Sequence, residues 1–218
     1  FIDGVLDSGT AFLINDYADT PNWKGDALFE EDLFNKLSVD VDSRGLQIAV
    51  HSIGDAAVHR VLNGYEYARE RNGIRDSRHR VEHIELIQKD DIARFKELDV
   101  IASMQPVHPP GSDGLPLEPT ISKIGHDRFN EAYAWRSIKE AGGKVTFSTD
   151  WPVSNVDPIN CIFNALNRQV WAEGQLDQRL SLIDTLKAYT IGGAYAEFKE
   201  HKKGLIQKNY LADIVVLS

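Results

Sequence analysis

Residues 46–68 read LQIAVHSIGDAAVHRVLNGYEYA and predict a β-strand followed directly by an α-helix. The short apolar run at 46–51 is typical of a buried strand, and it ends at His51. Behind Gly54 and Asp55, apolar residues return every three or four positions, which is the helical period: Ala57, Val58, Val61, Leu62, Tyr65 and Ala68. We therefore expect one strand–helix unit here.

The same unit recurs along the chain. A strand at 79–83 ends at His83, and Asp90 or Asp91 caps a helix with Ile92, Phe95 and Leu98 on its apolar face. A strand at 100–104, a loop rich in Pro and Gly at 105–125, a helix at 131–141 and a strand at 144–148 follow. Strands alternating with helices favour parallel strands joined by right-handed crossovers, so the expected fold class is α/β.

Two helices and a strand are expected in the remaining part. The first helix follows Pro158 and has one apolar face, formed by Ile159, Ile162, Phe163 and Leu166. Ser181 caps the second helix, whose inward-facing residues are Leu182, Leu186 and Tyr189. Residues 211–217 predict a final strand.

Composition narrows the class of protein. The 218 residues are 42% hydrophobic and 26% charged, as in globular domains, and the net charge of −9 argues against a nucleic-acid partner. A single cysteine, Cys161, excludes an internal disulfide and a thiolate-rich metal site. No apolar run is long enough for a membrane span, so we expect a soluble, cytoplasmic protein with no membrane partner. Assembly into a homo-oligomer is left open.

Three of the predicted strands end in, or just before, a side chain that can bind metal: His51, His83 and Asp150. The carboxyl ends of parallel strands in an α/β barrel converge on one face, which carries the active site. Neutral imidazoles and a carboxylate suit Zn²⁺ or a similar divalent ion. The competing interpretation is structural, because a lone His often closes a strand and an Asp often caps a turn.

Other histidines have other interpretations. The string HRVEH at 79–83 matches the motif of inverted zinc proteases, which requires a helix where the flanking residues favour a strand. His59, His79 and His201 are expected to be structural.

Four ordered motifs carry a family resemblance: HSIGDAA at 51–57, RVEH at 80–83, ASMQP at 102–106 and STDWPV at 148–153. They resemble the YtcJ-like branch of the amidohydrolase superfamily, amidohydrolase family 3, over essentially the whole chain. The resemblance implies the C-terminal portion of a metal-dependent (β/α)₈ TIM barrel at 1–200 and a segment of a small β-sandwich at 201–218. It places His51 and His83 at the ends of barrel strands five and six, and Asp150 at the end of strand eight.

The resemblance also implies a chemistry. Such enzymes hydrolyse amide or formamide-like, non-peptide C–N bonds of small molecules with water activated by one or two divalent ions, of which zinc is the default. Asp150 is then both a metal ligand and the catalytic general base, beside the ligands His51 and His83. Four further residues match positions near the substrate: Gln105, His108, Arg136 and Trp151.

The sequence departs from the family pattern in two places. Relatives carry a His-x-His pair after the first barrel strand and commonly a Lys that bridges two metals, and neither feature is found here. Since a complete barrel needs about 250 residues, we expect a portion of a longer enzyme that is inactive when isolated. The alternative is a non-catalytic amidohydrolase-like scaffold that binds a ligand or partner.

Overall fold

Four parallel strands form the centre of the molecule in the computed structural model, which describes residues 1–216. The strands are β1 (Ala49–Ser52), β2 (Arg80–His83), β3 (Ile101–Met104) and β4 (Lys144–Phe147), and they lie in the order β1-β2-β3-β4. The register pairs Val50 with Val81 and Val81 with Ala102. All of the strands predicted before residue 150 are present, and the parallel sheet confirms the α/β class.

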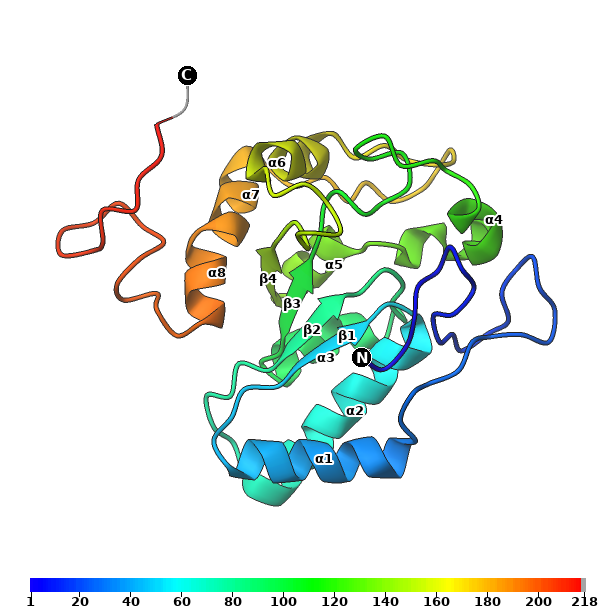
Figure 1. Cartoon of the computed structure of the whole chain (residues 1–218), viewed down its shortest axis with the longest axis horizontal. Coiled ribbons are helices and arrows are strands. Elements are labelled where there is room, and N and C mark those ends of the chain that lie inside the picture. Colours follow the sequence, from blue (N-terminus) through cyan, green and yellow to red (C-terminus); the bar gives the residue numbers. More distant parts are fainter. Residues whose placement is uncertain (217–218) are drawn as a thin grey trace.

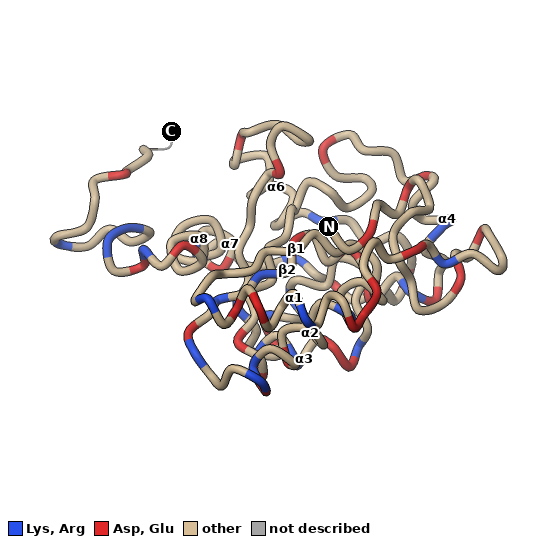
Figure 2. Tube along the Cα trace, turned by 60° about the horizontal axis from the view of Figure 1, so that its bottom comes forward, with Lys and Arg blue, Asp and Glu red and all other residues tan. Residues whose placement is uncertain are grey.

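Helices surround this sheet (Figure 1). In chain order they are α1 (Glu31–Ser43), α2 (Asp55–Asn72), α3 (Asp91–Glu97), α4 (Thr120–Ile124), the 3₁₀ helix η1 (His126–Glu131), α5 (Trp135–Glu140), α6 (Pro158–Asn167), α7 (Leu182–Tyr189) and α8 (Ile191–Ala196). Helix α2 follows β1 and packs against α1, while α7 and α8 contact β4. Charged residues of both signs gather around α1, α2 and α3 (Figure 2).

The core forms between the sheet and its helices. Val81 and Ala102 of the central strands are fully buried, as are Val58, Val61 and Leu62 on the predicted apolar face of α2. Complete burial of one such aliphatic side chain stabilises the fold by roughly 1.5–3 kcal/mol. The apolar residues that recur every three or four positions in residues 55–68 therefore identify the helix face that packs on the sheet.

The apolar face expected on α6 is only half-buried, and the inward face expected on α7 is confirmed at Tyr189 but not at Leu182. Phe163 is 60% exposed and Leu182 is 51% exposed, whereas Cys161, Ala165 and Ala188 are buried. Helix α7 contacts β4, and Tyr189 packs on Phe147 of that strand with ring centroids 5.7 Å apart. The apolar pattern predicts the helix but not the side on which a neighbouring element lies.

Several boundaries also differ from the prediction. The helix expected at 131–141 begins only at Trp135, because Tyr133 adopts a left-handed backbone conformation (φ 49°) that no α-helix can continue through. Ser181 caps α7 as predicted, since its hydroxyl accepts a hydrogen bond from the Asp184 amide. In contrast, the side chain of Asp90 makes no cap hydrogen bond at α3. The sequence patterns did not reveal α1, α4 or α8.

The strand expected at 211–217 is not formed in residues 211–216, and Leu217 lies outside the described residues. Val215 and Val216 are 80% and 91% exposed, because no strand edge among the described residues lies beside them. An apolar strand needs a paired edge, which explains why its composition alone misleads. The assignment of 201–218 to a β-sandwich remains a prediction. Within residues 1–216, no helix combines the length and the apolar character required to cross a bilayer.

Candidate metal centre

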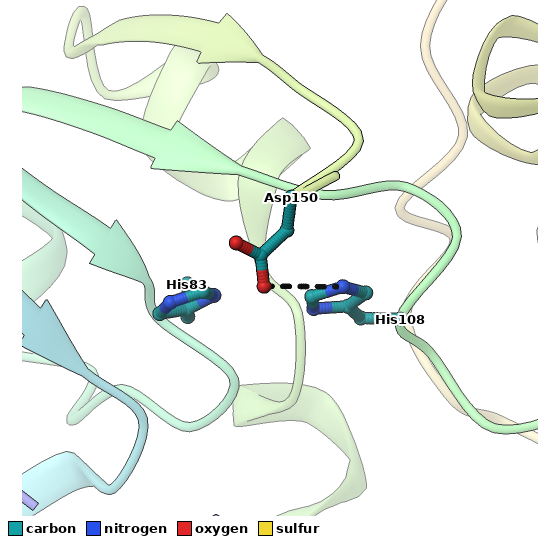
Figure 3. Close-up of side chains that lie close together, drawn as sticks. All are labelled: His83, His108 and Asp150. Atoms are coloured by element: carbon teal, nitrogen blue, oxygen red, sulfur yellow. Dashed lines mark ion pairs between the residues drawn. The ribbon is translucent and has the colours of Figure 1, made fainter. Parts of the chain in front are cut away.

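Three side chains from three post-strand loops meet at the carboxyl edge of the sheet (Figure 3). His83 ends β2, His108 follows β3 and Asp150 follows β4, and one ligand atom of each lies within 4.8 Å of the others. His108 Nε2 is 3.9 Å from Asp150 Oδ2, and the rings of His83 and His108 stack with centroids 5.8 Å apart. Parallel strands bring their carboxyl ends to one edge, so residues distant in the sequence become neighbours here.

The backbone turns sharply where these side chains leave the strands. His83 and Asp150 have left-handed φ angles of 76° and 58°, and Ile84 follows with 53°. Non-glycine residues in this region cost of order 1–3 kcal/mol each and concentrate at functional sites. The surrounding fold therefore holds both candidate ligands in a conformation that an isolated chain would avoid.

Gln105 fixes the orientation of His83. Its Oε1 lies 2.9 Å from His83 Nδ1, and its Nε2 donates to Ser148 Oγ at 2.9 Å. This network leaves Nδ1 as the protonated nitrogen of His83 and Nε2 with a free lone pair, as a metal ligand needs. Gln105 is buried, and the structure shows it behind His83 rather than on the pocket wall.

His51 lies beside the group of three. Its ring centroid is 4.6 Å from that of His83 and 4.6 Å from that of Phe1. Its Nδ1 is 3.4 Å from Asp3 Oδ1, but this carboxylate already accepts the amides of Ile53 and Gly54. The structure thus brings His51 next to His83 but not into the 4.8 Å group.

Two ring nitrogens in this region lack a hydrogen-bond partner. His51 Nδ1 and His108 Nε2 are buried and unpaired. Burial, followed by the neighbouring charge of His51, lowers the pKa of His83 and so favours its neutral form. Neutral imidazoles with free nitrogens, next to a carboxylate, are a donor set that fits Zn²⁺ or a related divalent ion.

A cavity of about 710 Å³ opens over the group, with His51, His83, His108 and Asp150 in its wall. This volume is typical of a site for a small molecule. Trp151 follows Asp150, is 67% exposed and lies outside the wall of this cavity among the described residues. Arg136 on α5 pairs with Glu140 at 2.7 Å and is likewise not part of the wall.

Two pocket residues were not singled out from the sequence. Glu85 lies two positions after His83, and its Oε1 is 3.7 Å from His108 Nδ1. The Tyr133 amide donates to the Glu85 carbonyl at 2.8 Å, and Tyr133 also lines the pocket. The position of Glu85 just beyond a strand was a usable signal, whereas Tyr133 sits in a segment that the sequence pattern assigned to a helix.

The string at 79–83 does not form a protease site. Residues 80–83 are strand β2, so His79 and His83 lie near opposite ends of an extended segment that rises about 3.3 Å per residue. His79 is buried against Asp42 at 3.0 Å, and Glu82 pairs with Arg80 at 3.0 Å. His59, which was also expected to have a structural role, contacts Asp91 at 3.0 Å.

The fold and the site define an α/β protein with a candidate metal centre, and the comparison with protein families identifies its family. Residues 1–218 match the model of the "Amidohydrolase family" over their whole length, and the chain belongs to this family. The resemblance seen in the sequence motifs is thereby confirmed.

Three curated relatives match the whole chain. The protein LONG AFTER FAR-RED 3 of Arabidopsis thaliana is 34% identical, and the chain covers 37% of it. The putative amidohydrolase YtcJ of Bacillus subtilis is 31% identical with 41% covered, and the N-substituted formamide deformylase of Arthrobacter pascens is 24% identical with 39% covered. The chain therefore spans about two fifths of the length of these relatives.

A solved structure shows the same fold. The uncharacterized metal-dependent hydrolase from Pyrococcus furiosus superimposes with a TM-score of 0.82 at 32% identity. The match covers 97% of this chain and 42% of that one. Family and structural neighbours together support a metal-dependent hydrolase.

Proposed function

We propose that the protein containing this chain hydrolyses a non-peptide C–N bond of the amide or formamide type in a small molecule, with a divalent metal ion. The observation that carries the proposal is the meeting of His83, His108 and Asp150 within 4.8 Å in the wall of a cavity. The name of the A. pascens relative, an N-substituted formamide deformylase, supports this type of bond.

The proposed ligands are His51, His83 and Asp150, and His108 is a further imidazole beside them. Zinc is the proposed ion, in one or two copies, because it accepts imidazole nitrogen and carboxylate oxygen. A bound ion of this kind lowers the pKa of water to about 7 and polarises a carbonyl oxygen.

Asp150 is the proposed general base. Its side chain is 35% exposed and reaches into the cavity, so one carboxylate oxygen can accept a proton from the attacking water. The same group then passes this proton to the nitrogen of the leaving amine. Removing the carboxylate should therefore abolish turnover more completely than it abolishes metal binding.

The remaining sequence-based assignments divide into two groups. We propose that Gln105 acts by positioning His83, and that His108 binds either the metal or the substrate carbonyl. Trp151 is proposed as a substrate contact at the rim, since it follows Asp150 and is exposed. The pairing of Arg136 with Glu140 and its hydrogen bond to the Asp177 carbonyl support a packing role instead.

The complete hydrolytic activity is proposed for the whole protein that contains residues 1–218. Because the chain spans about two fifths of their length, we propose that residues 1–218 alone do not turn over substrate. The partial TIM barrel at 1–200 and the β-sandwich segment at 201–218 are proposed on the family resemblance.

Elemental mass spectrometry tests the proposal. The purified protein should contain one to two divalent ions per chain, and the variants His83→Ala and Asp150→Ala should contain fewer. His79→Ala is the matched control, because His79 is buried at the other end of β2 and should leave the metal content unchanged. A folded protein without bound metal would contradict the proposed hydrolase function and would favour the alternative of a non-catalytic scaffold.

A further inference from the structure

The wall of the cavity carries negative charge beyond the candidate metal ligands. Four more carboxylates line it, and none of the described residues in the wall is a Lys or Arg: Asp7, Glu82, Glu85 and Glu118. Glu82 is compensated, because Arg80 Nε lies 3.0 Å from its Oε1. The described ion pairs give no Lys or Arg partner to the other three.

Glu85 is the most informative of these carboxylates. It is nine-tenths buried, and its one ion pair within residues 1–216 is with His108 Nδ1 at 3.7 Å, beyond hydrogen-bonding distance. Burial, followed by the charge of Glu85 and its hydrogen bond with the Tyr133 side chain, raises the pKa of Tyr133 well above its usual range. The partner of Glu85 at this position is therefore a neutral hydroxyl and not a cation. A buried carboxylate that faces a cavity without a cationic partner strongly disfavours a second negative charge nearby.

The rest of the wall is mostly apolar. Phe1, Val5, Leu6, Leu115 and Val153 contribute to it. Side chains of this kind hold a hydrocarbon or aromatic group by removing its surface from water. The cavity of about 710 Å³ therefore combines an apolar wall with an acidic lining.

We propose that the pocket takes amides whose N-substituent is apolar and carries no negative charge, and that it rejects substrates bearing a carboxylate. This inference rests on the proposed function and narrows its substrate class. A divalent ion would add two positive charges, but at His83, His108 and Asp150, so it offsets the ligand Asp150 before it offsets Asp7, Glu85 and Glu118. An N-acyl amino acid is accordingly excluded, whereas a neutral N-arylalkyl formamide fits.

Three matched compounds test the inference on the metal-loaded, full-length protein that contains this chain: N-benzylformamide with a para methyl, a para aminomethyl or a para carboxylate group. The carboxylate compound should have a kcat/KM at least about tenfold below that of the methyl compound, because like charges in a partly buried pocket repel. The aminomethyl compound, which is a cation at neutral pH, should not show this loss.

Variants identify the groups responsible. Glu85→Gln, at the buried carboxylate, should bring the kcat/KM of the carboxylate compound several-fold closer to that of the methyl compound, and Asp7→Asn and Glu118→Gln, at exposed carboxylates, should have smaller effects in the same direction. Asp40→Asn is the matched control, because Asp40 is an exposed residue of α1 that pairs with Arg44. The ratio between compounds is the measured quantity, so a general loss of activity in Glu85→Gln does not affect the conclusion.

Calorimetric binding of the same compounds separates the two proposals. If no compound is hydrolysed although metal is bound, the proposed reaction fails, and a weaker affinity for the carboxylate compound still supports the charge preference. Equal affinity and equal kcat/KM for the three compounds would overturn the inference, as would tighter binding of the carboxylate.

Discussion

The histidines at the two ends of the sheet have opposite environments. At the amino end, both ring nitrogens of His79 are used, since Nδ1 accepts the Ile48 amide at 3.0 Å and Nε2 contacts Asp42 at 3.0 Å. At the carboxyl end, His51 Nδ1 and His108 Nε2 are buried without a partner. Histidine ring nitrogens are thus fully hydrogen-bonded at the amino end of the sheet and partly unpaired at the carboxyl end.

This difference teaches which histidines stabilise the fold and which are available for chemistry. Asp42 also contacts Arg75 at 2.7 Å and accepts Asn72 Nδ2 at 2.8 Å, so the amino end is a closed network that links α1 to β2. A buried polar atom without a partner costs roughly 1–3 kcal/mol. A ligand in the cavity would complete His108 Nε2, which lies 3.9 Å from Asp150, whereas His51 Nδ1 faces Asp3 Oδ1 at 3.4 Å.

The largest expected effect is on catalysis at the carboxyl end. Asp150→Asn keeps the size of the side chain but removes the base, and kcat should fall by about 10²–10⁴-fold. Steady-state kinetics of the metal-loaded, full-length protein that contains this chain, with an amide substrate, checks this, and Asp40→Asn is the control. A kcat within a few-fold of the wild type would show that another group carries the proton.

The second effect concerns metal affinity through Gln105. Gln105→Leu removes the hydrogen bond to His83 Nδ1 and should weaken divalent-ion binding about 10–100-fold. Competition with a chelator measures the affinity. Unchanged affinity would mean that packing alone orients His83.

The third effect is on stability at the amino end. His79→Ala leaves Asp42 and the Ile48 amide without this partner and should lower the free energy of unfolding by about 1–3 kcal/mol, with metal content unaffected. Denaturant unfolding followed by circular dichroism provides the value. Loss of metal in a folded His79→Ala protein would contradict the assignment of a structural role to the amino end of the sheet and a metal-binding role to its carboxyl end.

The smallest effect is a pH dependence at Glu200. Its hydrogen bonds from Arg78 lower the pKa of this carboxyl from 4.5 to about 2. A lowered pKa stabilises the fold above the ordinary value, and this contribution is lost as the pH falls toward about 2. Wild type should therefore exceed Glu200→Gln in thermal stability at pH 6 and lose that advantage in strong acid. A difference that does not change with pH would exclude the charge as its cause.

Much of the fold follows from local patterns, and the site follows only in part. The strands at His51 and His83 and the helix behind Gly54 were predicted because short apolar runs and helical spacing are local properties. The family resemblance placed His108 near the substrate, but its position within the metal-binding group was not predicted, because it depends on the path of the loop after β3, which has no periodicity. The position of His51 beside the group likewise depends on Phe1 and Asp3, far away in the sequence.

The apolar face predicted on α6 shows the same limit. Ile159 and Phe163 of this face are 45% and 60% exposed, while Cys161 is buried. Periodicity reveals that a helix has an apolar side, and only the position of neighbouring elements determines whether that side is covered.

The most direct test is anomalous X-ray diffraction from crystals of the protein grown with zinc. We predict a strong anomalous peak in the cavity, about 2.0–2.2 Å from an oxygen of Asp150 and a nitrogen of His83. A cavity without a peak at full zinc loading, or zinc bound only at surface carboxylates, would contradict the assignment of this site as a metal centre.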